Sequence, residues 1–347
     1  MKGNEALAEA AIRAGCKCFF GYPITPQTEV AAYFAKKLPK VGGTFLQAES
    51  EIAAINMVYG AASAGVRTMT SSSSPGISLK TEGISYICGA DLPCVIINVQ
   101  RGGPGLGGIQ PSQADYFQAT RALGHGDSRV IVFAPSSVQE MVNVVNKAFN
   151  LADSYRMPAM ILADGLLGQM MEPVEFPETE AETFEKPWAT VGHGGVREHN
   201  IANSLYLKPD VLEKSILDRQ KRYEDIEDKH TEADCYLTDD AEIVVCAYGA
   251  TARICKSAVN AARAKGIKAG LFRPVTLWPY PKKELIKASE NAKSLLTVEM
   301  STGQMIEDVK LSIDCKKPVH FYGRTGGIIP TPAEVTAEIE KIAKEGV

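Results

Sequence analysis

The sequence lacks three features that would point to particular classes of protein: a long apolar run, an excess of positive charge and a cluster of cysteines. No apolar stretch approaches the roughly 18 residues that cross a bilayer, so we expect no membrane-spanning segment. Lysine and arginine number 37 against 41 acidic residues, and the net charge of -4 argues against nucleic acid as the main partner. The N-terminal segment is an amphipathic pattern with acidic residues and does not resemble a signal peptide.

The eight cysteines are scattered along the chain, and most of them stand among apolar residues. Such a pattern is typical of buried thiols in a reducing compartment, so we expect a cytoplasmic protein. The sequence contains no C-x-x-C-x-x-C run, and we therefore expect this chain to bind no iron–sulfur cluster. Cys16 and Cys18 have no second pair to match them, which does not fit the spacing of a structural metal site.

Short apolar runs alternate with helical patterns through the first half of the chain. Continuous runs such as LPCVIINV and PAMILAD predict strands that are buried on both faces, as in a parallel sheet. Residues 136–155 predict a helix, because Ser137 stands three residues before Glu140 in a capping-box pattern. The alternation as a whole predicts an α/β fold with a doubly wound, mostly parallel sheet.

This alternation stops after Glu172, where proline and glutamate dominate, and charged residues then dominate from 208 to 234. The charged stretch is most simply an exposed helix or connector. Strand-like and helical patterns then resume. We therefore predict a sheet domain over 1–185, a charged connector over 186–238 and a smaller α/β unit over 239–347.

Several widespread catalytic motifs are missing as well. The chain contains no G-x-S-x-G, no Walker motif and no H-E-x-x-H. His125 lies in a loop-like segment without a recognisable partner acid or nucleophile, so a structural role is the simpler interpretation. Because open α/β sheets bind ligands beyond the carboxyl ends of their strands, the loops that leave the predicted strands are the places to look for a site.

Two acidic residues stand at the start of the predicted helix in ESEIAAINMVYGAASAG, where the helix macrodipole favours negative charge. Glu49 and Glu51 are two positions apart and therefore point to nearly opposite sides of the helix. The stripe through Glu51 is apolar, whereas the stripe through Glu49 contains Asn56 and Gly60. Glu51 is therefore predicted to turn inward, where it needs a partner, and a ligand is one possibility.

The loop GYPITPQT follows the first predicted strand and holds Thr25 close to two prolines. Pro23 and Pro26 each fix their own φ and bias the preceding residue toward an extended shape. Pro26 suits the first turn of a helix, which makes Thr25 a candidate N-cap. A rigid loop at a helix N-terminus could also direct donors toward an anion, and both interpretations can hold together.

Two further loops combine polar residues with glycine. Arg101 directly follows the most apolar strand, and the glycines after it allow close approach of the backbone. Arg101 could grip a carboxylate with two parallel hydrogen bonds, or it could be a solvated residue of a flexible surface loop. The glycine spacing does not match a dinucleotide site. The loop TSSSSPGISL could form an anion nest or simply a polar turn.

Four segments together resemble the pyrimidine-binding, alpha-type subunit of the 2-oxoacid:ferredoxin oxidoreductases: GYPITPQT, ESEIAAINMVYGAASAG, TSSSSPGISLK and NVQRGGPGLGGIQPSQADYFQA. These are thiamine-diphosphate enzymes of anaerobic metabolism. The resemblance spans nearly the whole chain and implies that its last part is a transketolase C-terminal-like domain. SSSSPGISLK and ADGLLGQMMEPVEF most resemble the branched-chain, 2-oxoisovalerate type.

The resemblance implies roles for individual residues. Glu51 would bond N1′ of the aminopyrimidine ring of thiamine. Thr25 and Arg101 would lie at the substrate, where they would hold its carboxylate and the developing oxyanion. The residues lining the cofactor would be Pro23, Ile24, Ser74, Pro75 and Gly76.

The implied reaction is the CoA-dependent oxidative decarboxylation of a 2-oxoacid to acyl-CoA and CO₂, with electrons passing to ferredoxin. The chain lacks the G-D-G…N segment that holds the diphosphate and Mg²⁺ in this family, and it lacks cluster cysteines. The resemblance therefore implies a diphosphate-binding beta-type subunit, a gamma-type subunit and a ferredoxin-like iron–sulfur subunit as partners. Mg²⁺ and the iron–sulfur clusters would be bound there, and this chain would be inactive alone.

Two alternatives remain open. The same scaffold could act on 2-oxoglutarate or pyruvate, since the sequence does not place the extra cation that a second carboxylate would need. The chain could also be a non-catalytic assembly module that has kept the fold of such a complex.

Overall fold

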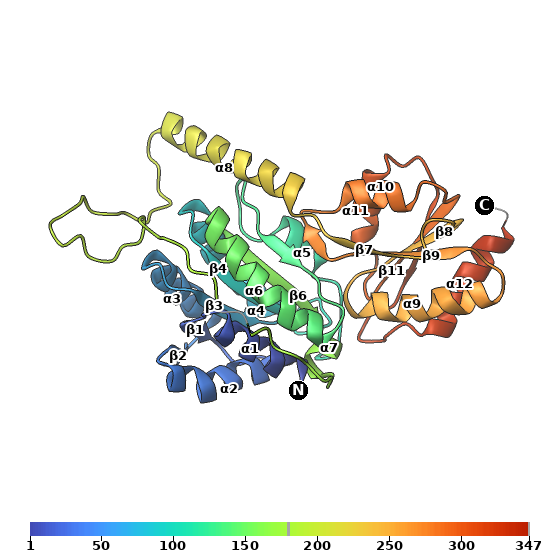
Figure 1. The fold of residues 1–347 in the computed structure, drawn as a ribbon, viewed down its shortest axis with the longest axis horizontal. Coiled ribbons are helices and arrows are strands. Elements are labelled where there is room, and N and C mark those ends of the chain that lie inside the picture. Colours follow the sequence, from blue (N-terminus) through green and yellow to red (C-terminus); the bar gives the residue numbers. More distant parts are fainter. Residues whose placement is uncertain (179–180, 346–347) are drawn as a thin grey trace.

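The computed structural model describes residues 1–178 and 181–345, which form two sheets and their covering helices (Figure 1). The first sheet has seven strands in the order β10-β5-β6-β4-β3-β1-β2. Neighbouring strands are parallel except β10 and β5, so the predicted mostly parallel sheet is confirmed. The strands are β1 (Cys18–Gly21), β2 (Thr44–Gln47), β3 (Thr68–Ser72), β4 (Cys94–Gln100), β5 (Ile131–Phe133), β6 (Pro158–Asp164) and β10 (Thr276–Trp278).

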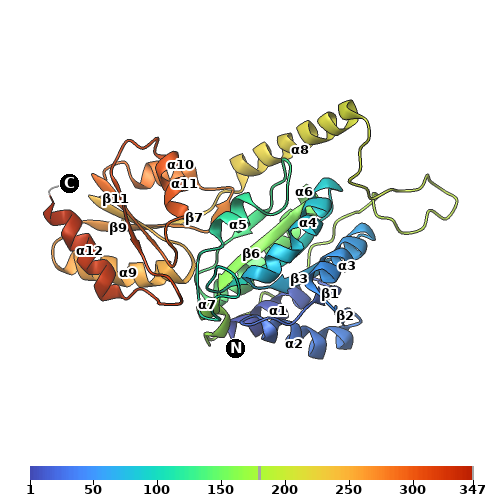
Figure 2. The same cartoon turned by 180° about the vertical axis from the view of Figure 1, so that it is seen from behind.

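Helices cover both faces of this sheet, as the doubly wound prediction requires. Helix α6 lies in front of the sheet in Figure 1 and packs on α1, whereas α4 lies in front in the opposite view of Figure 2 and packs on α3. The helices are α1 (Gly3–Arg13), α2 (Thr28–Lys37), the 3₁₀ helix η1 (Leu38–Val41), α3 (Glu51–Ser63), α4 (Ser74–Gly89), α5 (Tyr116–Arg121), α6 (Val138–Tyr155) and α7 (Gly165–Gln169).

The start of α6 follows the predicted cap only in part. The Ser137 side chain accepts a hydrogen bond from the backbone N–H of Glu140 at 3.1 Å, as expected of an N-cap. The Glu140 carboxylate does not close a capping box on Ser137. It accepts instead from the backbone N–H of Ser136 at 2.8 Å and from the guanidinium of Arg273.

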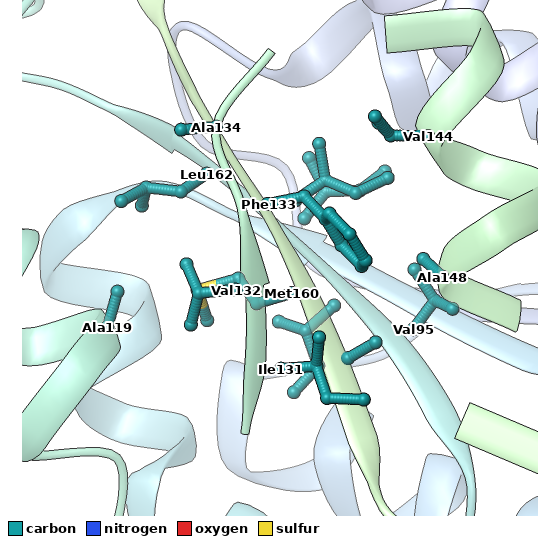
Figure 3. Packing of buried hydrophobic residues seen from close by; sticks show 14 of the residues in the cluster. Val95, Ala119, Ile131, Val132, Phe133, Ala134, Val144, Ala148, Met160 and Leu162 are labelled. Carbon is teal, nitrogen blue, oxygen red and sulfur yellow. The ribbon is translucent and has the colours of Figure 1, made fainter. Parts of the chain in front are cut away.

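The core of the first sheet is apolar on both sides of β5, which explains its continuous apolar sequence. In Figure 3, Ile131 and Phe133 point to the side of α6, where Ala148 lies, and Val132 points to the side of Ala119 on α5. The three strand residues are fully buried. Because helices pack on both faces, every position of the strand is apolar, and no alternation is visible in the sequence.

The second sheet has five strands in the order β12-β11-β8-β9-β7, all parallel except β7, which is antiparallel to β9. The predicted second α/β unit is therefore present. Its strands are β7 (Ala233–Tyr236), β8 (Ile243–Cys246), β9 (Ala269–Pro274), β11 (Ser294–Glu299) and β12 (Val319–Gly323). Its helices are α9 (Gly249–Ala264), α10 (Lys282–Ala288), α11 (Met305–Ser312) and α12 (Pro332–Lys344).

Two strands cross the predicted boundaries of 186–238 and 239–347. Strand β7 lies within the expected connector but pairs in the second sheet, and β10 lies within the expected second unit but pairs with β5 in the first. Both are edge strands, which satisfy their backbone hydrogen bonds at whichever sheet edge is within reach, and the sequence does not specify that edge. In the chain just before β7, α8 (Pro209–Lys229) is the mostly exposed helix that the charge pattern predicted.

A buried hydrogen-bond cluster joins the two sheets. The Gln113 side chain, which is fully buried, donates to the Tyr248 carbonyl at 2.8 Å and accepts from the Thr251 hydroxyl at 2.7 Å and the Met300 N–H at 3.0 Å. Asp164 lies beside this junction, where its carboxylate caps α7. Burial raises the pKa of Asp164 to about 6.

No helix in the described ranges is long and apolar enough to span a membrane. The eight cysteines are free thiols; five of them are buried, Cys18 is half-buried, and Cys235 and Cys315 are exposed.

Candidate active site

The carboxyl ends of four neighbouring strands bring the predicted site residues to one edge of the first sheet. Strands β4, β3, β1 and β2 are adjacent and parallel, so the loops that follow them leave on the same side. Arg101 follows β4, Ser74 follows β3, Thr25 follows β1, and Glu51 follows β2. Such an edge is where open α/β sheets bind their ligands.

Glu51 is the first residue of α3 and is only 7% exposed, whereas Glu49 is exposed. Ser50 caps this helix by accepting a hydrogen bond from the Ala53 N–H at 3.2 Å. The Glu51 carboxylate therefore lies near the positive end of the helix dipole. It makes no hydrogen bond or ion pair with another residue of the described chain. The prediction that Glu51 turns inward is confirmed.

Gly76, in the first turn of α4, allows the Glu51 carboxylate to approach. A Cβ atom at position 76 would lie 2.7 Å from Oε1 of Glu51 and 2.1 Å from Oγ of Ser72, which is closer than real contacts allow. The hydroxyls of Ser72 and Ser73 are buried and have no hydrogen-bond partner in the part of the chain that is described. Both serines are therefore buried and do not form an exposed polar turn, and Ser72 lies against Gly76 beside Glu51.

A buried polar cluster holds the backbone of Ser74, whose φ is +24°. The Ser74 N–H donates to Oδ1 of Asn98 at 3.1 Å, and its hydroxyl donates to the Asp115 carboxylate at 2.6 Å. Asn98 also donates to Asp115, at 2.9 Å. Burial raises the pKa of Asp115, although the hydrogen bonds from Ser74 and Asn98 oppose this effect. The cluster fixes the loop between β3 and α4.

Arg101 is 9% exposed, so its interpretation as a solvated residue of a flexible loop is wrong. Its guanidinium donates through Nη1 to the Thr25 carbonyl at 2.9 Å and through Nη2 to the Leu106 carbonyl at 3.4 Å. Its Nε is buried without a hydrogen-bond partner among the residues described. Since both acceptors are neutral, the guanidinium retains positive charge and donors with which to bind an anion.

Thr25 is not the helix N-cap that one interpretation predicted. Helix α2 begins at Thr28, and Gln27 occupies the N-cap position, where its side chain is buried and accepts from Ser71. Pro26 therefore lies in the turn before the helix and not in its first turn. The Thr25 side chain is exposed, while its carbonyl binds Arg101, so the structure brings these two predicted residues together.

The remaining predicted lining residues lie in the loop after β1 and in the first turn of α4. Pro23 is exposed, and Ile24 and Pro75 are half-buried. The described residues contain no group of three or more His, Cys, Asp or Glu side chains that could hold a metal ion.

Sequence reasoning missed three residues of this edge: Lys80, Asn98 and Asp115. Lys80 had a visible signal, because it is the one charged residue in the otherwise apolar stripe of α4 that begins at Gly76. Asn98 had a weaker signal, as a polar residue inside the apolar run of β4. Asp115 follows a long loop, and nothing in the sequence predicted that its carboxylate would accept a hydrogen bond from Ser74.

Two family models match the chain in succession. The model for pyruvate flavodoxin/ferredoxin oxidoreductase, thiamine diphosphate-binding, matches residues 9–244, and the model for pyruvate:ferredoxin oxidoreductase core domain II matches residues 241–335. The chain belongs to this family. It is a component of a thiamine-diphosphate-dependent 2-oxoacid:ferredoxin oxidoreductase, and the predicted resemblance is confirmed.

Curated relatives match over nearly their full length. The ketoisovalerate oxidoreductase subunits VorB of Methanothermobacter marburgensis and Methanothermobacter thermautotrophicus are 48% and 47% identical, over 99% of this chain and 98% and 97% of theirs. The 2-oxoglutarate synthase subunit KorA of Methanothermobacter thermautotrophicus is 38% identical, over 99% of this chain and 98% of its own.

Solved structures share the fold. The 2-oxoglutarate:ferredoxin oxidoreductase from Magnetococcus marinus, with 2-oxoglutarate, coenzyme A and succinyl-CoA bound, superposes with a TM-score of 0.83 at 27% identity. The match covers 98% of this chain but only 64% of that chain. A split-gene transketolase superposes with a TM-score of 0.63 at 16% identity, over 98% of this chain and 97% of its own, which shows a common fold.

Proposed function

We propose that this chain is the pyrimidine-binding subunit of a complex that oxidatively decarboxylates a branched-chain 2-oxoacid such as 2-oxoisovalerate. Coenzyme A takes the acyl group, CO₂ leaves, and the electrons pass to ferredoxin. The substrate class rests on identity: ketoisovalerate oxidoreductase subunits are 47–48% identical to this chain, and 2-oxoglutarate synthase subunits of similar coverage are 35–38% identical.

The observation that carries the proposal is the buried carboxylate of Glu51 at the carboxyl edge of the sheet. A buried carboxylate that accepts no hydrogen bond from the chain has acceptor capacity left for a ligand, and a buried polar group without a hydrogen bond is costly. The aminopyrimidine ring of thiamine fits, because N1′ can share a proton with Oε1 or Oε2 of Glu51. Gly76 leaves room beside Oε1, and the free hydroxyls of Ser72 and Ser73 add polar capacity. Ile24, Pro23, Ser74 and Pro75 would line the rest of this half of the site.

Bound thiamine diphosphate supplies the electron sink that lets a 2-oxoacid lose CO₂. Arg101 has the donors to bind the substrate carboxylate, since its Nε is free and its Nη atoms are held in place by the Thr25 and Leu106 carbonyls. The exposed side chain of Thr25 lies on the same loop, where its hydroxyl can donate to an oxyanion that develops on the substrate.

The proposal requires partner subunits. Diphosphate is normally held through Mg²⁺ by oxygen ligands, and this chain lacks the G-D-G…N segment to which the family resemblance assigns them. A diphosphate-binding beta-type subunit would hold that end of the cofactor. A gamma-type subunit and a ferredoxin-like iron–sulfur subunit would complete the complex and carry the electrons away.

The test uses the complex purified with its natural partners and two matched variants. Glu51→Gln should lower the CoA-dependent reduction of a one-electron dye by 2-oxoisovalerate by about 100-fold or more, while the complex elutes normally in size-exclusion chromatography. Glu49→Gln, two residues away and exposed, should leave the rate unchanged. Unchanged turnover in Glu51→Gln would favour the non-catalytic assembly module, and faster turnover of 2-oxoglutarate or pyruvate would overturn the substrate class.

A further inference from the structure

Lys80 is a fully buried lysine one helical turn after Gly76 on α4. Its ammonium group donates a hydrogen bond to Oγ1 of Thr70 at 2.8 Å. An ammonium group carries three N–H donors, and one hydroxyl does not compensate its charge. Burial of an ammonium group is costly unless an opposite charge lies nearby, so a counter-charge for Lys80 must be identified.

The acid that faces Lys80 is Glu51. Positions 76 and 80 are four residues apart and so lie on the same side of α4, and Gly76 is the residue that contacts Glu51. On the strand below, Thr70 and Ser72 are two residues apart and share one face of β3. Ser72 contacts Gly76, and Thr70 binds Lys80. Gly76 and Lys80 on α4 thus face Ser72 and Thr70 on β3. Lys80 binds Thr70 at one end of these two facing rows, and Glu51 lies beside Gly76 and Ser72 at the other end.

The groups that face Lys80 come from three packed elements. Glu51 faces it from α3, the thiol of Cys94 faces it from β4, and β3 contributes the Thr70 hydroxyl. Burial raises the pKa of the Cys94 thiol, so that group stays neutral at ordinary pH. Glu51 is therefore the acid whose charge opposes the effect of burial on Lys80, across a separation too long for a direct ion pair.

We propose that Lys80 is a positioning residue for Glu51: its ammonium group, anchored on Thr70, supplies the positive charge that orients the Glu51 carboxylate at the thiamine-facing end of α3. A carboxylate held in that orientation would be placed to share a hydrogen bond with N1′ of the aminopyrimidine ring. The inference rests on the proposed function, because it assigns Lys80 to the residue that binds the aminopyrimidine ring.

The proposal has a consequence for pH. Burial lowers the pKa of Lys80 to about 8, an effect that the charge of Glu51 opposes. The support that Lys80 gives to Glu51 is therefore present at pH 7 and is lost as the pH rises through about 8. Between pH 7 and pH 9 the protonated fraction of Lys80 falls about tenfold, so the affinity for thiamine diphosphate should fall by up to the same factor.

The experiment measures the dissociation constant of thiamine diphosphate for the complex, purified with its partner subunits and stripped of cofactor, from pH 6.5 to 9.5. The wild type should bind about tenfold more weakly at pH 9 than at pH 7. Lys80→Met should bind about tenfold more weakly at pH 7 and lose the alkaline step. Thr70→Val keeps the volume but removes the anchoring hydroxyl, and it should move the step to lower pH.

The controls separate this inference from a general loss of stability and from the proposed function. Lys186→Met removes a mostly buried lysine that pairs with Asp153, and it should leave the alkaline step in place. A wild type without the step, or a Lys80→Met complex that retains it, would overturn the role of Lys80 even if the variant folds poorly. If Glu51→Gln loses turnover while Lys80→Met matches the wild type, only this inference fails; if Glu51→Gln is also unaffected, the proposed function fails with it.

Discussion

Replacement of Gly76 by alanine is a sharp test of the site, because it places one carbon against Glu51. The new Cβ would lie 2.7 Å from Oε1 of Glu51, about 0.7 Å closer than the 3.4 Å of an ordinary contact. Both Glu51 and Ser72 can relieve the clash by rotating their side chains, so the free energy of unfolding should fall by only about 1 kcal/mol. The carboxylate must move, however, and a displacement near 1 Å at a reacting centre can lower turnover about 100-fold.

Two other glycines provide matched controls. A Cβ at Gly83, on the same helix, would lie 2.5 Å from Cγ2 and 2.9 Å from Cγ1 of Ile55, which are short, branched groups close to the backbone. Gly83→Ala should therefore cost more stability, about 1–3 kcal/mol, but leave the Glu51 carboxylate in place. Gly60 is exposed on α3, and a Cβ added there would meet no atom within 4 Å, so Gly60→Ala should raise the stability by up to about 1 kcal/mol.

The assay pairs urea unfolding of each variant with turnover and thiamine diphosphate affinity of the assembled complex. The expected order is opposite for the two properties: Gly83→Ala is the less stable variant, and Gly76→Ala is the less active one. A Gly76→Ala complex with wild-type turnover and cofactor affinity would refute the placement of Glu51 at the reacting centre.

Three further predictions concern the scaffold. Arg67→Met should lower the free energy of unfolding by about 3 kcal/mol, because Arg67 binds the buried Asp153 at 2.7 Å. Arg121→Met removes an ion pair whose arginine is 38% exposed, and it should lower the free energy of unfolding by less than about 1 kcal/mol. Equal losses of the two variants in urea unfolding would contradict this prediction. The pKa of Asp164 rises from 3.8 to about 6 on folding, so its protonated form is favoured in the native state and its contribution to stability declines as the pH rises from about 4 to 6. The stability advantage of Asp164→Asn, which keeps a capping side chain, should therefore grow by up to about 3 kcal/mol over that range and then level off; a difference independent of pH would argue against a buried, ionised Asp164. Ser137→Ala should cost about 1 kcal/mol through loss of the α6 cap, and an unchanged melting temperature would contradict that role.

The fold followed from local patterns that depend on neighbouring residues. Apolar runs such as that of β5 predicted buried strands, and the stripe through Glu51 predicted which of two acids turns inward, because helix periodicity alone decides that question. The cap of α6 at Ser137 was visible for the same reason. These features are set within one or two helical turns.

Features set by distant contacts were not predictable in the same way. Strand β10 joined the first sheet, although its sequence neighbours belong to the second, because pairing with β5 depends on how the two units dock. Thr25 was not an N-cap, since the carbonyl of its loop is bound by Arg101, 76 residues further along the chain. Asp115 accepts a hydrogen bond from Ser74, 41 positions earlier in the chain, and such a distant contact was not visible in the sequence.

The measurement that tests the central claim most directly is a structure of the assembled complex with thiamine diphosphate bound. We predict that a carboxylate oxygen of Glu51 lies within hydrogen-bonding distance of N1′ of the aminopyrimidine ring, with Gly76 beside it and the diphosphate on another polypeptide. A Glu51 side chain that faces solvent, with N1′ bound by a different residue, would contradict the account.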